Sequence, residues 1–360
     1  GHFAPSLPLH LGNNTFTLRY QNEQRQIVVN RVSGQPTLSP GLPFAKDSLT
    51  PKVDIARLPG ELICFSAIAT PNATVSVILG NQNIPLISQS LLAQIPSNQA
   101  ALTGQYQVPN HSSLSSGGIS EYKGCAKANA PGNLGRPEFK ITIDGKTTTE
   151  MAQGNIEVLS PTQLEIAEVT ADGGVARTGP STDFSRLTPL PKGTQATITG
   201  REGEWLRLDY GGWISSQEVR IVQAGVPPTT IVRTLRVRQV PGATEILFPL
   251  QVAVPISVQQ GDRTFTITLY NTTAQTDTIR LDDDPLISRL DWQQIAPGQV
   301  QYIFNLKSSQ QWGYQIKYDR TNLVVTLRHS PTNSPEIKEN ADKPLAGIKI
   351  LLDPGHGGTE

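Results

Sequence analysis

Gly203-Glu204-Trp205-Leu206-Arg207-Leu208, followed by Gly211-Gly212-Trp213-Ile214, is the stretch of this sequence that says most about its fold. In each half, glycine comes before a short run with a tryptophan and aliphatic residues, which is typical of a turn leading into a strand. Two such strands in close succession indicate a small barrel of about five or six strands. Because so small a domain has little else to bury, we expect Trp205 and Trp213 to fill its core.

The preceding residues extend this pattern. Val175-Ala176-Arg177-Thr178-Gly179-Pro180-Ser181-Thr182 and the Gly-Thr turn within residues 190–194 come before it in an order that resembles the bacterial SH3-like domain of cell-wall proteins. The resemblance covers residues 160–223 and implies binding of wall peptides or glycan strands. Arg177, Trp205 and Trp213 are then candidate substrate-binding residues. In the alternative that we favour, both tryptophans belong to the core and Arg177 is a structural partner at a strand end.

The composition favours turn-rich β-structure. Only 17% of the residues are charged, and the 360 residues include 28 prolines and 31 glycines, which punctuate short runs of Val, Ile and Leu. Lys and Arg total 30, as do Asp and Glu, so no net field attracts nucleic acid or an anionic membrane surface. No run approaches the roughly 18 apolar residues of a membrane span. We therefore expect a mainly β fold of tandem β-sandwich modules plus the SH3-like barrel.

Two β-regions precede the SH3-like region. Residues 1–32 contain two strands joined by a short polar turn, and we expect these to be the last strands of a β-domain truncated on its N-terminal side. Residues 33–159 contain several runs that alternate between apolar and polar residues, the period of strands. Within this second region, residues 84–95 are a candidate for one short helix.

The two cysteines of the chain, Cys64 and Cys125, both fall in expected strands of residues 33–159. This pattern, with Tyr122 shortly before the second cysteine, suggests an immunoglobulin-like sandwich pinned across its two sheets by a disulfide. The Tyr-x-Cys spacing and the core tryptophan of that family are absent, so the resemblance is to the architecture only. We expect a Cys64–Cys125 disulfide, with two buried free thiols as the alternative.

A stiff Gly-Val-Pro-Pro linker at 225–228 leads into a fourth region, residues 229–330, which we expect to be a β-sandwich. It resembles the β-rich accessory domains that precede the catalytic domain in cell-wall amidases. Asp282-Asp283-Asp284, with Asp291 nearby, raises the question of a calcium site, but the spacing fits no EF-hand loop. We favour a solvated acidic turn. Residues 331–345 are polar and proline-punctuated, as in a linker.

The end of the sequence carries the most specific motif. Residues 346–360 contain Ile348-Lys349-Ile350-Leu351-Leu352, an expected buried strand, and then Asp353-Pro354-Gly355-His356-Gly357-Gly358. They closely resemble the first strand and first metal-ligand loop of the zinc-dependent N-acetylmuramoyl-L-alanine amidases. The resemblance implies that His356 is the first of three zinc ligands. In that family zinc polarises the amide carbonyl between N-acetylmuramic acid and L-alanine and activates a water.

The other ligands and the catalytic glutamate of that family come after the first strand of its α/β domain, beyond residue 360. One histidine cannot hold a catalytic zinc. We therefore expect the full-length protein to be a zinc enzyme, and this chain to be inactive, with no catalytic residue of its own and no bound metal. Its role is then that of a wall-targeting and regulatory portion.

The chain as a whole looks like the multi-domain amidases of cyanobacteria, in which β-modules and an SH3-like domain precede the catalytic unit. This resemblance implies export to the periplasm or cell envelope, with peptidoglycan as the partner, and makes the disulfide more plausible. The alternative is a non-enzymatic wall-binding or adhesin protein of tandem β-modules, in which residues 353–358 are only a turn. The sequence following Glu360 distinguishes the two.

Overall fold

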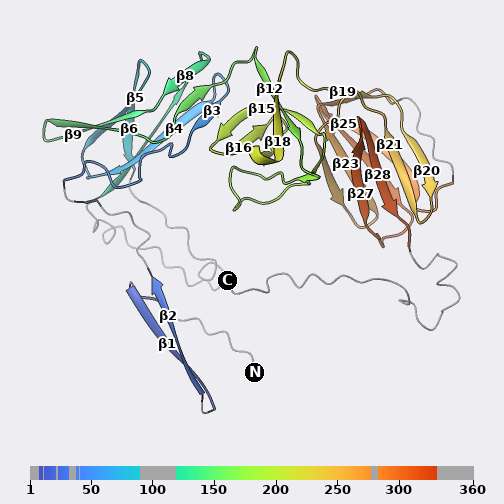
Figure 1. Ribbon diagram of the computed structural model, residues 1–360, viewed down its shortest axis with the longest axis horizontal. Coiled ribbons are helices and arrows are strands. Elements are labelled where there is room, and N and C mark those ends of the chain that lie inside the picture. Colours follow the sequence, from blue (N-terminus) through green and yellow to red (C-terminus); the bar gives the residue numbers. More distant parts are fainter. Residues whose placement is uncertain are drawn as a thin grey trace. The chain divides into compact units, whose positions relative to one another are not determined.

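The computed structural model describes residues 8–10, 12–21, 23–31, 38–39, 41–89, 119–276 and 283–330. These residues are almost entirely in strands and turns (Figure 1), and the mainly β fold class is confirmed. Their only helical element is one 3-10 turn, η2 (Ser216–Glu218). No helix in this part of the chain is long and apolar enough to cross a membrane. Residues 331–360, including the expected strand and His356, lie outside the described residues.

Near the N-terminus, β1 (Gly12–Tyr20) and β2 (Glu23–Arg31) form the expected antiparallel hairpin. Eight of the nine residues of β2 are exposed, among them Ile27 and Val28. Within the described residues, no third strand pairs with the hairpin. That the hairpin ends a larger, truncated domain stays a prediction.

The chain divides into two compact units. The first contains a six-stranded sheet in the order β10-β9-β5-β6-β7-β4, with a core in which Phe139 makes edge contacts with Phe44 and Phe65. Its strands are β4 (Leu62–Ala69), β5 (Thr74–Leu79), β6 (Gln82–Gln89), β7 (Ser120–Lys127), β9 (Glu138–Ile143) and β10 (Lys146–Met151), and the short β8 (Gly132–Gly135) and β11 (Ile156–Val158) are neighbours in a second sheet.

The candidate helix at residues 84–95 is wrong in its first half, because β6 runs through Gln82–Gln89. Ile84 and Leu86 are buried while Pro85 between them is exposed, which is the alternation of a strand. The remaining residues, 90–95, lie outside the described part of the chain.

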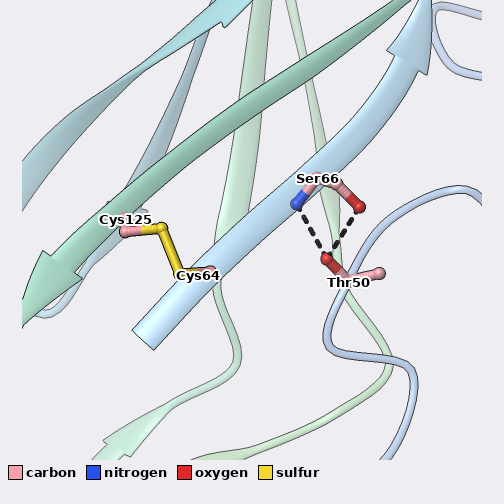
Figure 2. Close-up of a disulfide and its surroundings, with 4 residues drawn as sticks. All are labelled: Thr50, Cys64, Ser66 and Cys125. Atoms are coloured by element: carbon pink, nitrogen blue, oxygen red, sulfur yellow. Dashed lines mark hydrogen bonds between the residues drawn. A yellow bond between two sulfur atoms is a disulfide. The ribbon is translucent and has the colours of Figure 1, made fainter. Parts of the chain in front are cut away.

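Cys64 and Cys125 form a disulfide with a sulfur–sulfur distance of 2.14 Å. They are directly opposite one another on β4 and β7, which are neighbouring strands of one sheet (Figure 2). The expectation that the disulfide pins two sheets together is therefore wrong. Both cysteines are exposed, since Ile63 and Phe65 on either side of Cys64 point into the core and Cys64 points outward. The disulfide lies on the outer face of the sheet.

On the other edge of β4, the loop before the sheet is attached through a hydroxyl. Thr50 Oγ1 accepts a hydrogen bond from the Ser66 backbone N–H at 2.7 Å and lies 3.0 Å from Ser66 Oγ (Figure 2). The Thr50 N–H in turn donates to the Ser66 carbonyl. This exchange satisfies backbone groups that an edge strand would otherwise leave unpaired.

The second unit begins with a small barrel-like domain. Its core consists of Ala167, Val169, Ala176, Leu190, Ala196, Ile198, Leu206, Leu208 and Ile214. Its strands are β12 (Leu164–Val169), β13 (Gly173–Gly174), β14 (Leu190–Pro191), β15 (Gln195–Glu202), β16 (Trp205–Leu208), β17 (Trp213–Ser215) and β18 (Val219–Ala224).

One strand of this domain comes from far upstream. β3 (Ile55–Arg57) pairs with the end of β15, at Arg201 and Glu202. The Arg57 guanidinium donates to the Arg201 carbonyl and to the Glu202 carboxylate, both at 2.8 Å. Residues 55–59 accordingly belong to the second unit although the residues on both sides of them belong to the first. The domain boundary expected at residues 159–160 does not include this strand.

The second unit ends in the expected β-sandwich (Figure 1, yellow to red). Two four-stranded sheets, β20-β21-β28-β27 and β22-β23-β26-β25, enclose a core that includes Phe248, Tyr302 and Phe304. The strands are β19 (Thr230–Val232), β20 (Arg236–Val240), β21 (Ala243–Phe248), β22 (Ile256–Gln260), β23 (Thr264–Tyr270), β24 (Thr272–Ala274), β25 (Ile287–Ala296), β26 (Gln299–Leu306), β27 (Tyr314–Asp319) and β28 (Asn322–Arg328).

Candidate functional site

The two tryptophans of the small barrel lie outside its core. Along β16 and β17 the residues Leu206, Leu208 and Ile214 point inward and are almost fully buried, whereas Trp205 and Trp213 are only half-buried. Because successive side chains of a strand point to opposite faces, the tryptophans lie on the outer face. The expectation that they fill the core is wrong, since three aliphatic side chains already do so.

Four residues share this outer face, which we call the Trp face: Arg177, Trp205, Arg207 and Trp213. Trp205 and Arg207 are alternate residues of β16, and Arg207 is directly opposite Trp213 on β17. Arg177 is bridged to Trp213 on its other side, with both backbone hydrogen bonds formed at 2.8 and 2.9 Å. Residues directly opposite one another on neighbouring strands project to the same side, so the side chains of all four residues project from one face.

Arg177 is the buried member of the Trp face. Only 9% of its surface is exposed, and its Nη1 donates to the carbonyl oxygens of Thr182 and Phe184, both at 2.8 Å. Its guanidinium carbon lies 5.9 Å from the ring centre of Trp205, within range of a cation–π contact. These contacts fit the structural role expected for Arg177 and also hold the loop of residues 178–185 in place.

That loop adds an aromatic side chain that the sequence analysis did not single out. Phe184 is 45% exposed, and its ring packs over Gly179, where an added Cβ would come within 2.5 Å of ring atoms. Any larger residue at this position would displace the Phe184 ring from its place over Gly179. Arg177 is bonded to the backbone carbonyl of this residue.

Arg207 is the second functional candidate that sequence reasoning missed. Its Nε donates to Thr199 Oγ1 at 3.1 Å and its Nη2 to the Thr199 carbonyl at 2.5 Å. These bonds, and the close approach of the guanidinium to Gly200, hold the Arg207 side chain against β15. Arg207 lies between Leu206 and Leu208 in the strand, so its side chain projects to the same face as Trp205. A charged residue on that face is the sequence pattern that indicates exposure to solvent.

The acidic residues of the sandwich form no metal site among the described residues. Asp284 is 2% exposed and accepts hydrogen bonds from the backbone N–H groups of Leu286 and Ile287 and from Thr244 Oγ1. Asp284 therefore anchors a loop. The solvated acidic turn that we favour from the sequence is wrong for this residue. Asp283 is fully exposed and pairs with Lys307, as expected, and Asp282 lies outside the described residues.

His356 also lies outside the described residues, so its assignment as a zinc ligand stays a prediction. The candidate site of this structure is therefore the Trp face.

Residues 172–220 match the family of the bacterial SH3 domain. The chain thus contains a bacterial SH3 domain, in the region where the sequence motifs place it, and such a domain is consistent with a cell-wall-binding role. No curated protein matches the chain.

Among solved structures, a DUF4784 family protein from Bacteroides caccae ATCC 43185 is 7% identical, with a TM-score of 0.17, and the match covers 64% of this chain and 66% of that one. The I9–I11 tandem from titin is 8% identical, with a TM-score of 0.17, and the match covers 78% of this chain and 89% of that one. Similarities at this level carry no statement about function. The chain spans slightly less than two thirds of the first of these structures.

Proposed function

We propose that this chain is the wall-targeting portion of a secreted peptidoglycan amidase, and that the Trp face of its SH3 domain contacts the wall. The observation that supports the wall-binding half is the Trp face itself. Two half-exposed tryptophans and two fixed arginines share the outer face of a domain of the bacterial SH3 family.

The chemistry of the Trp face suits an uncharged or zwitterionic polymer. Indole rings offer flat apolar surfaces on which sugar rings and peptide groups stack, and guanidinium groups donate hydrogen bonds to hydroxyl, carbonyl and carboxylate oxygens. Because Arg177 and Arg207 are already held by carbonyl and hydroxyl oxygens of the domain, little side-chain entropy is lost when a ligand binds. Glycan strands and stem peptides of peptidoglycan have this chemistry.

The amidase half of the proposal is supported by residues 347–358, with the Asp-Pro-Gly-His-Gly-Gly motif. His356 is proposed to hold zinc together with further ligands of the complete enzyme, where the metal would polarise the scissile amide. The coding sequence that follows Glu360 tests this half. A glutamate and a second histidine in an α/β pattern support the amidase, whereas further β-repeats overturn it in favour of the adhesin.

The wall-binding half is tested by co-sedimentation of the chain with purified peptidoglycan. Trp205→Ala and Trp213→Ala are each expected to weaken binding about tenfold, as for an anchoring aromatic residue. Trp292→Ala is the matched control, because Trp292 is 36% exposed and lies in the sandwich. Far-UV circular dichroism confirms that the variants are folded. Undiminished binding by both folded Trp-face variants would overturn the assignment.

A further inference from the structure

The SH3 domain and the sandwich, both within the second unit, exchange specific hydrogen bonds. The Gln195 N–H at the start of β15 donates to the Ala253 carbonyl at 2.7 Å. In the other direction, the Val258 N–H of β22 donates to Thr188 Oγ1 at 2.9 Å. Each of these backbone donors has its partner in the other module, so each is satisfied only while the two modules are together.

Two tyrosines pack against one another at the same place. The rings of Tyr210 and Tyr270 have their centres 5.0 Å apart with an interplanar angle of 46°. Gly212 makes room for the first ring, since an added Cβ would lie 2.3 Å from Tyr210 Oη. Burial raises the pKa of the Tyr210 phenol well above its ordinary value, as expected for a ring removed from water by its neighbours.

A polar pair closes the rim of this contact. Asp209 Oδ2 accepts a hydrogen bond from the Thr197 N–H of its own domain at 3.0 Å and another from Asn271 Nδ2 of the sandwich at 2.9 Å. Asn271 has a φ of 51°, a left-handed conformation that asparagine adopts more readily than most residues. The side-chain amide is thus presented to Asp209 by a turn suited to this residue.

We propose that the SH3 domain and the sandwich are held as one rigid body by this joint, which consists of Asp209, Tyr210, Tyr270 and Asn271. Residues 225–228, the covalent link between them, are exposed except for Pro228, and the contacts of the joint are made by residues outside this link. The joint fixes the direction in which the Trp face points relative to the sandwich. This inference does not depend on what the Trp face binds.

Asn271→Asp tests the joint in the full chain. It places a second carboxylate beside Asp209, and like charges at this distance repel. Hydrogen exchange of two backbone amides, Gln195 and Val258, is the readout, because both donate across the joint. We expect both amides to exchange about tenfold faster in the variant. Asn72→Asp is the matched control, because Asn72 also has a positive φ, 64°, and lies in the first unit.

The reciprocal variant makes the result specific. Asp209→Asn combined with Asn271→Asp restores one amide donor opposite one carboxylate, and we expect it to return both amides toward their original exchange rates. Exchange of the two amides at unprotected rates in the parent chain would overturn the proposal. So would an Asn271→Asp variant in which neither amide changes, or one in which only one of them does. Wall binding is not measured, so the outcome is independent of the proposed function.

Discussion

Asp209 is the residue at which the pH dependence of this protein is expected to be concentrated. Burial of its carboxyl group raises its pKa above the ordinary value of 3.8, and hydrogen bonds from Thr197 and Asn271 offset only part of this effect. The residue as a whole is exposed, but its Oδ2 is enclosed by these two partners. A raised pKa in the folded state means that the protonated form is favoured by folding.

We predict that Asp209→Asn removes the decrease in the free energy of unfolding that the parent shows as the pH rises through the pKa of this carboxyl group. In the parent, the stabilising contribution is complete below pH 3.8 and is lost as the pH rises through the higher pKa of the folded state. The variant is therefore expected to gain stability relative to the parent between this acidic range and neutrality. Urea unfolding across this range measures the difference. Asp172→Asn is the control, because its side chain is 98% exposed, and an equal gain there would contradict the prediction.

The site residues themselves were largely predictable from the sequence, whereas the face on which they lie was not recognised. The glycine–tryptophan runs single out Trp205 and Trp213, but the size of an indole ring wrongly predicts that both are buried in the core. The core is filled instead by Leu206, Leu208 and Ile214, which alternate with them. Phe184 is not predicted, because no local pattern contains the close approach of its ring to Gly179.

At the scale of elements, the disulfide between β4 and β7 differs in kind from the one expected. The strands are already joined by their backbone pairing, and the sulfurs lie on the outer face. We predict that a reductant such as dithiothreitol reduces it in the native protein without unfolding, since access does not require the core to open. Alkylation after native reduction, followed by mass spectrometry, should label both cysteines. Labelling only in denaturant would contradict this.

Strand positions were predictable where alternation is regular. β21, β23 and β28 have buried residues at nearly every second position. β25 has ten residues, but its pairing with β26 shifts register at two places. Such irregularities break the period of two from which a strand is recognised. β3 was missed because its three residues are stabilised by Arg201 and Glu202, far away in the sequence.

At the scale of the whole molecule, the SH3 domain depends on residues that precede it by more than a hundred positions. Ile55 and Ala56 are 8% and 2% exposed, and Arg57 bonds to Glu202 and the Arg201 carbonyl. We predict that a fragment of residues 160–330, which lacks β3, is less stable than the same part of the full chain by about 2–4 kcal/mol. Urea unfolding monitored by tryptophan fluorescence provides the comparison. A peptide of residues 53–61 added in trans should restore part of the loss, and an unchanged midpoint for the fragment would contradict the dependence.

The placement of β3 has a mechanical consequence. The polypeptide enters the second unit at Ile55 and returns to the first unit at Gly60. It enters the second unit again at Ala130, returns to the first at Asn133, and stays in the second unit from Val158 onward. The polypeptide therefore passes between the two units five times, and a single cut at one crossing leaves the other four intact. Two units joined by a single linker would be separated by one such cut.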